Sequence, residues 1–230
     1  MKTRAWIPLA AALLAAGAGF IAFRQTHPPG PGLRPVAEAP APATVEAGAG
    51  SDAPANLPVP EEVPALKLAD LAGKPRALRG TNGRPRLFNF WATWCAPCRK
   101  EIPLLNTLED RYRADQLEVV GIAIDFQDAV ATFLKKVPMS YDTLIGEEDG
   151  LEAARSFGMG MALPFSVFAD GQNHVVAVKL GELHADEIAA ILGRMREVRS
   201  GKATLAESRA AIGEDIKTLA VKRAKQSADL

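Results

Sequence analysis

The cysteine content is the feature that most constrains how this chain can fold. Its only two cysteines, Cys95 and Cys98, are three positions apart. A disulfide between them closes a very short loop and therefore removes little entropy from the unfolded chain. The pair cannot hold distant segments together, so a disulfide-rich scaffold is excluded. The fold must depend on an apolar core, and the pair itself is suited to reversible oxidation.

The composition agrees with a protein that has such a core. The 230 residues are 48% hydrophobic and 23% charged, which is ordinary for a globular protein. The formal net charge is zero, so there is no electrostatic reason to expect nucleic acid or an acidic surface as a partner.

The N-terminus has the pattern of an export signal. Lys2 and Arg4 precede an uncharged run rich in Ala and Leu over residues 5–23, which ends at Arg24. As a helix this run would rise about 28 Å, close to the hydrocarbon thickness of a bilayer. Because the positive residues come first, we expect a single-pass anchor in the inner membrane with the rest of the chain in the periplasm. The alternative is a signal peptide cleaved near Ala16-Gly17-Ala18, which would leave a soluble periplasmic protein.

A second compositional segment follows, from Gln25 to about Glu62. It is rich in Pro, Ala and Gly, has no period of 2 or 3.6, and contains few large apolar residues. Such a segment cannot bury enough surface to offset the entropy lost on ordering. We expect a disordered spacer that holds a domain away from the membrane.

From Val63 onward the pattern alternates between strands and helices. Asp170-Gly171 indicates a hairpin between the last two strands, and Pro103 should kink the helix that begins at the cysteines. Strands are expected at 87–91, 117–124, 143–145, 165–169 and 174–180, and helices from the cysteines to about 113, at 128–136, at 150–157 and at 185–198. This order predicts an α/β sheet covered by helices. Beyond Ser200, an apolar stripe predicts an amphipathic helix on the domain surface.

The position of the pair suggests unequal roles for its two sulfurs. A strand that delivers Cys95 to the first turn of a helix places this sulfur beside unpaired N–H groups, which favour the thiolate. We expect Cys95 to be the exposed nucleophile and Cys98, one turn deeper, to resolve the mixed disulfide. A zinc site would need two further ligands. The histidines, His27, His174 and His184, lie in a linker, a turn and a helix start.

The stretch from Phe88 to Pro103, with Trp-Cys-Ala-Pro-Cys-Arg-Lys-Glu at its centre, resembles the TlpA-type branch of the thioredoxin superfamily. The resemblance covers roughly residues 63–198. That group contains membrane-anchored bacterial thiol–disulfide oxidoreductases, including those that serve cytochrome c maturation. The resemblance implies a thioredoxin fold, with a central mixed sheet flanked by helices, and no cofactor besides the redox-active disulfide. It also implies a cis-proline loop facing the active site, and Pro164 occupies that position.

Two further positions concern proton transfer. Many thioredoxins carry a buried Asp six residues before the first cysteine, where this chain has Asn89, which cannot titrate. TlpA-type reductases often carry a Glu three residues after the second cysteine, and Glu101 matches it. A carboxylate near a buried thiol could accept or return its proton. The alternative is that Glu101 is a solvated helix residue beside Lys100.

The predicted function is thiol–disulfide exchange with protein partners in the periplasm, with Cys95, Cys98, Glu101 and Pro164 as catalytic residues. The resemblance suggests a reductase that serves apocytochrome c or copper-site assembly factors and receives electrons from a membrane partner. A peroxidase is disfavoured, because the Pro and Thr pattern of peroxidases ahead of the cysteine is absent.

A copper(I) chaperone is the remaining alternative, because two thioethers beside two thiols could hold this soft ion. The thioethers would come from Met159 and Met161, just before the Pro164 loop. The simpler interpretation is that these methionines form an adaptable apolar rim against partner proteins.

The sequence thus predicts four segments. They are a signal anchor or transmembrane helix at 1–24, a Pro/Ala-rich disordered linker at 25–62, a thioredoxin-like domain at 63–199 and a C-terminal amphipathic helical extension at 200–230.

Overall fold

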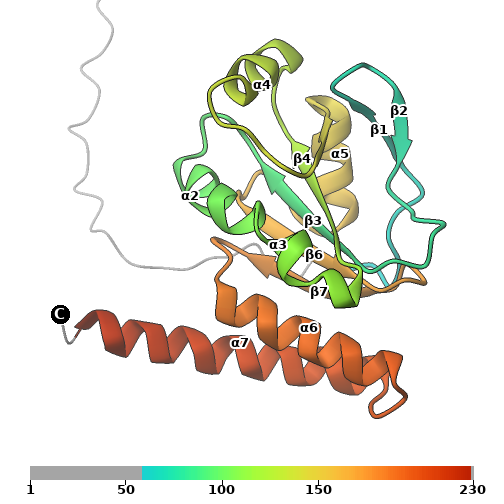
Figure 1. The fold of residues 1–230 in the computed structure, drawn as a ribbon, viewed down its shortest axis with the longest axis vertical. Coiled ribbons are helices and arrows are strands. Elements are labelled where there is room, and N and C mark those ends of the chain that lie inside the picture. Colours follow the sequence, from blue (N-terminus) through green and yellow to red (C-terminus); the bar gives the residue numbers. More distant parts are fainter. Residues whose placement is uncertain (1–58, 229–230) are drawn as a thin grey trace, which may run out of the picture. The chain divides into compact units, whose positions relative to one another are not determined.

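The computed structural model describes residues 59–228, which form a seven-stranded sheet with helices on both faces (Figure 1). The strands are β1 (Lys67–Asp70), β2 (Pro75–Ala77), β3 (Arg86–Trp91), β4 (Glu118–Ala123), β5 (Asp142–Ile145), β6 (Phe165–Ala169) and β7 (Val175–Leu180). The helices are α2 (Ala96–Leu105), α3 (Leu108–Arg111), the 3-10 turn η1 (Arg113–Asp115), α4 (Gln127–Leu134), α5 (Glu148–Ser156), α6 (Ala185–Arg199) and α7 (Leu205–Ala228). The predicted anchor and nearly all of the predicted linker lie outside the described residues.

The sheet is mixed, in the order β2-β1-β5-β4-β3-β6-β7. β3 pairs in parallel with β4, and β4 in parallel with β5. β6 runs antiparallel to β3, and β7 antiparallel to β6. The predicted α/β sheet of thioredoxin type, mixed and flanked by helices, is therefore present.

Apolar residues fill both faces of the central strands, because helices cover both faces. Phe88 and Phe90 of β3 pack with Phe157 at the end of α5 on one face. Leu87 points to the other face, where α2, α3 and α6 supply the core. A third cluster, built around Trp91 and the two cysteines, closes the carboxyl ends of the parallel strands.

Most elements lie within two residues of the expected positions, but the first helix is shorter than expected. α2 ends at Leu105, and α3 begins only at Leu108, so the expectation of one helix to about residue 113 is wrong. The side chain of Asn106 donates to the carbonyl of Pro138 (3.1 Å) and accepts from the N–H of Ser140 (2.9 Å). These contacts fasten the break to the segment before β5, and apolar spacing alone cannot reveal them.

The hairpin of β1 and β2 is missing from the sequence prediction. β1 pairs antiparallel with β5 and extends the sheet at one edge. Only Leu68 of β1 is fully buried, and β2 is exposed throughout, so neither strand shows the apolar run that reveals β3 and β4.

α7 lies alongside α6 and contacts β7 (Figure 1). The two helices are antiparallel, because Arg194 of α6 pairs with Asp215 while Asp186 pairs with Arg223. Ile212 of α7 is buried in the second core cluster. Within residues 59–228, no helix combines the length and the apolar character needed to cross a membrane.

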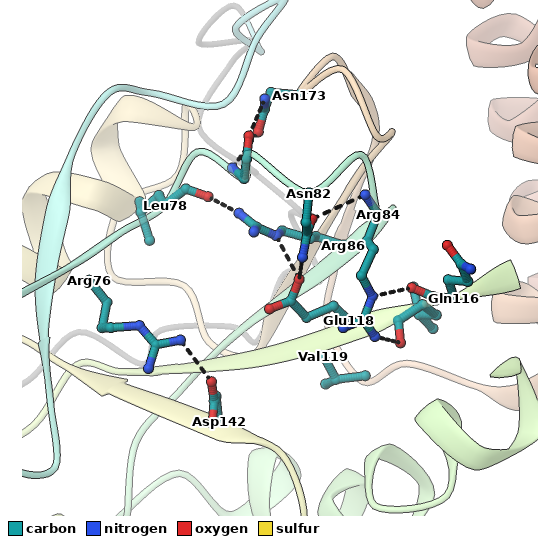
Figure 2. A network of polar contacts seen from close by, with 12 residues as sticks. Arg76, Leu78, Asn82, Arg84, Arg86, Gln116, Glu118, Val119, Asp142 and Asn173 are labelled. Atoms are coloured by element: carbon teal, nitrogen blue, oxygen red, sulfur yellow. Dashed lines mark hydrogen bonds and ion pairs between the residues drawn. The ribbon is translucent and has the colours of Figure 1, made fainter.

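A polar network closes the end of the sheet opposite the cysteines (Figure 2). Arg86, the first residue of β3, donates to the carbonyl of Leu78 (2.7 Å) and to Glu118 of β4 (3.1 Å). The Arg86 side chain is 11% exposed and that of Glu118 is 19% exposed. The network thereby joins the segment before β3 to the starts of both central strands.

Candidate active site

The two cysteines lie where β3 gives way to α2, as the sequence predicts. Cys95 caps the N-terminus of α2, and its sulfur accepts from the backbone N–H of Cys98 at 3.3 Å. Pro97 stands in the first turn of the helix. The cysteines are joined as a disulfide, with Cα atoms 5.3 Å apart. The sulfur of Cys95 therefore faces the positive end of a helix, which favours a thiolate once the bond is reduced.

The expectation that Cys95 is exposed needs correction for the disulfide form. Cys95 is only 5% exposed and Cys98 only 1%. Both pack in the third core cluster with Trp91 and Ala92, and Leu163 packs against this cluster from another loop. Cys95 is still the more accessible of the pair, which is consistent with the predicted order of attack.

The Pro164 loop lies against the cysteines. The Leu163–Pro164 peptide bond is cis, as the family resemblance implies. Leu163 packs on the cluster that contains both cysteines, and the carbonyl of Pro164 accepts from the N–H of Gly181 (2.8 Å). The loop before β6 and the start of α2 therefore meet at the disulfide. A catalytic role for Pro164 stays a prediction.

Glu101 is buried rather than solvated, because α2 turns this side chain into the core. It is 2% exposed. One carboxyl oxygen accepts from Asn89 Nδ2 (2.7 Å) and the other from the N–H of Leu183 (2.9 Å). Burial raises the pKa of Glu101 to about 7, although both hydrogen bonds act to lower it. Because Glu101 follows Cys98 by three residues, both side chains lie on one face of α2.

Sequence reasoning missed three residues around Asn89 and Glu101. Ser166 of β6 accepts a second hydrogen bond from Asn89 (3.2 Å), and Leu183 offers only its backbone. The hydroxyl of Tyr141 is buried without a partner among the described residues. Burial and then the charge of Glu101 raise the pKa of Tyr141. The one sequence signal was Asn89 itself, a polar residue inside an apolar strand.

Three exposed apolar side chains belong to the loops around the disulfide. Trp94 is 61% exposed, Phe126 62% and Met161 59%. The loops of Trp94 and Phe126 are tied together, because Asp125 accepts from the N–H (2.9 Å) and the hydroxyl (2.6 Å) of Thr93. Asp125 therefore joins the two loops. An apolar rim of this kind suits a polypeptide partner.

The residues considered for metal binding are less well placed. Met159 is partly buried against the first core cluster, whereas Met161 is exposed, so the two thioethers have different surroundings. His174 is bound to Asp170 (2.9 Å), and His184 caps α6. Residues 59–228 contain no group of three or more His, Cys, Asp or Glu that could hold a metal ion. The copper interpretation stays an untested alternative.

The fold and this site agree with the comparisons to known proteins. The model of the AhpC/TSA family matches residues 59–190, which is more than half of the chain. The chain belongs to the AhpC/TSA family. The match includes the cysteine pair, Glu101 and Pro164, and ends inside α6.

Relatives of this AhpC/TSA protein are named for redox chemistry. The chain is 29% identical over 141 residues to the thiol-disulfide oxidoreductase ResA of Bacillus thuringiensis (strain Al Hakam). The alignment covers 61% of this chain and 80% of that protein. It is 30% identical over 134 residues to the thioredoxin-like protein YneN of Bacillus subtilis (strain 168), covering 56% of this chain and 75% of that protein.

A solved structure agrees with the fold of the AhpC/TSA protein. A putative thiol:disulfide interchange protein DsbE from Chlorobium tepidum superimposes with a TM-score of 0.52 at 26% identity, covering 61% of this chain and 96% of that one. The predicted enzyme class, a thioredoxin-like thiol–disulfide oxidoreductase, is confirmed by these relatives.

Proposed function

We propose that the chain is an extracytoplasmic thiol–disulfide oxidoreductase that exchanges the Cys95–Cys98 pair with protein partners, acting as a reductase in cytochrome c or metal-site assembly. The observation that carries the proposal is Glu101, buried one turn beyond Cys98. With a pKa of about 7, its carboxyl group can accept a proton near neutral pH and give it back. A buried thiol that must ionise before it attacks needs such a group.

The reductive direction starts from the dithiol. The Cys95 thiolate attacks one sulfur of a partner disulfide, and the other partner sulfur leaves as a thiolate. Cys98 passes its proton to the Glu101 carboxylate, and its thiolate attacks the Cys95 sulfur of the mixed disulfide. The partner is released with both sulfurs reduced. Its disulfide has gained the two electrons that the Cys95 and Cys98 thiols lose when they form the Cys95–Cys98 disulfide. Asn89 and Leu183 hold the Glu101 carboxylate throughout.

The proposed setting rests on the sequence. Lys2, Arg4 and the uncharged run over residues 5–23 support an anchor in the inner membrane with the catalytic domain in the periplasm; a cleaved signal peptide is the alternative. In an oxidising compartment the dithiol must be regenerated, which calls for a membrane electron donor.

Trapping of partners tests the exchange. In Cys98→Ser the mixed disulfide on Cys95 cannot be resolved, so periplasmic partners should accumulate as adducts on non-reducing gels and disappear on reduction. The double variant Cys95→Ser, Cys98→Ser is the control and should trap nothing. Absence of any adduct with the single variant would contradict the proposal.

The reduction potential tests the direction of electron flow. A reduction potential of about −270 mV, similar to that of thioredoxin, supports a reductase. A more oxidising potential, about −120 mV, would instead make the protein a donor of disulfides. The measurement uses equilibration of the full chain with glutathione buffers.

A further inference from the structure

The appended helix α7 is connected to the active site through one side chain, Arg223. We propose that Arg223 is a positioning residue for Glu101: it fixes the N-terminus of α6 and so holds the Leu183 N–H on the Glu101 carboxylate. This inference rests on the proposed function and extends it to a part of the chain outside the family match, which ends at residue 190.

The first link joins α7 to the first turn of α6. Arg223 contacts Glu187 Oε1 through Nη2 (2.5 Å) and both carboxylate oxygens of Asp186 through Nη1 (2.8 and 2.9 Å). The Glu187 side chain is fully buried, and its other oxygen accepts from the N–H of His184 (3.1 Å). One buried carboxylate is therefore shared between α7 and the cap of α6.

The second link joins that cap to the carboxyl group of the site. Leu183 immediately precedes His184, and its N–H donates to Glu101 Oε2 (2.9 Å). Two consecutive backbone N–H groups thus contact two buried glutamates. One is Glu187, held by Arg223, and the other is Glu101, on α2 one turn beyond Cys98. A shift of the α6 cap must move the donor on which Glu101 depends.

A second cation supports the same loop from β7. Lys179 Nζ lies 3.7 Å from Glu187 Oε1 and donates to the carbonyls of Leu180 (2.9 Å) and Glu182 (3.3 Å). Without Arg223, Lys179 would be the only cationic side chain within 4.0 Å of the Glu187 carboxylate among residues 59–228, and the carboxylate could draw the cap out of place.

Loss of Arg223 should raise the pKa of Glu101. The groups that act on this carboxyl are the N–H of Leu183, the amide of Asn89 and the charge of Lys179, which lower its pKa, and the charge of Glu182, which raises it. A weaker hydrogen bond from the N–H of Leu183 favours the protonated form of Glu101. Other polar neighbours, Tyr141 and Ser166 on the sheet side and Cys98 on α2 itself, stay in place.

The titration of Glu101 in the full chain tests the proposal, read by carbon-13 NMR of the labelled carboxyl group. Arg223→Gln should move the midpoint upward by about half a pH unit or more. Arg194→Gln is the matched control, because Arg194 also joins α6 to α7, through Asp215 (3.0 Å), but lies nearly three turns from the α6 cap. The control should leave the midpoint unchanged.

A lysine variant separates position from charge. Arg223→Lys keeps the positive charge but lacks the planar guanidinium, whose two terminal nitrogens contact both oxygens of Asp186 and Oε1 of Glu187 at once, so it should leave part of the upward shift in place. The variant also serves if Arg223→Gln does not fold. An unchanged midpoint in folded Arg223→Gln, equal shifts in Arg223→Gln and Arg194→Gln, or a wild-type midpoint in Arg223→Lys would each overturn the proposal. The titration needs no partner protein, so a shifted midpoint in a chain without exchange activity would contradict only the proposed function.

Discussion

At the scale of single residues, the site depends on a carboxyl group placed where water cannot reach it. Asn89 stands on β3 and donates to Glu101 from the position where many thioredoxins have an aspartate. An amide at this position can orient the carboxylate without competing for its proton. The proton therefore has one titrating site here rather than two coupled ones.

The buried carboxyl group should make stability depend on pH. The pKa of Glu101 is about 7 in the folded chain against an ordinary value of 4.5, so the folded state binds a proton more tightly than the unfolded state. This contribution is complete below the ordinary value and is lost as the pH rises through 7. Relative to Glu101→Gln, the free energy of unfolding of the wild type should fall by about 3 kcal/mol between acidic and mildly alkaline pH.

Denaturant unfolding of the oxidised protein at several pH values measures this difference. Comparison with Glu101→Gln cancels the other titrating groups, because they are common to both proteins. Parallel pH profiles for the two proteins would show that Glu101 titrates normally and is not buried in solution.

At the scale of elements, the apolar pattern of the sequence was sufficient to predict those strands whose own side chains are apolar and buried. β3, β4 and β6 were predictable for this reason. β1 and β2 were not, because β1 is held by pairing with β5, far along the chain. The burial of Glu101 could not be predicted either, because the groups that donate hydrogen bonds to its carboxylate belong to β3 and to the segment before α6.

α7 should contribute to stability through its buried face. Ile212 is 3% exposed and packs in the second core cluster, so Ile212→Ala should destabilise the chain by about 2–5 kcal/mol. Val221, 56% exposed on the same helix, provides the control, and Val221→Ala should change stability by about 0.5 kcal/mol or less. Urea unfolding measures both. Equal effects would mean that α7 does not pack on the sheet as described.

At the scale of the whole molecule, one end of the sheet carries the redox site and the other carries a network of polar contacts. The disulfide, the Pro164 loop and Glu101 gather where β3 ends. The network of Arg86 and Glu118 lies where β3 and β4 begin (Figure 2). Changes at the beginning of β3 should therefore affect stability and leave the chemistry intact.

Glu118→Gln tests this separation. Arg86 is nearly buried and would lose a charged acceptor, so the variant should lose about 1–3 kcal/mol of stability while its exchange rate at a fixed pH stays the same. Asp142→Asn is the matched control, because the Arg76–Asp142 pair is about half exposed and should contribute about 1 kcal/mol or less. A large fall in exchange rate for folded Glu118→Gln would refute the separation.

The first described residues enter the fold along the start of β7. The N–H of Val63 donates to the carbonyl of Asn173 (2.9 Å), Glu62 forms a bridge with His174, and Arg209 of α7 contacts Glu61. This point of entry lies at the end of the sheet opposite the disulfide. A mechanical pull on the preceding chain would therefore load the β7 edge and α7 first, and not α2, the helix that carries the cysteines.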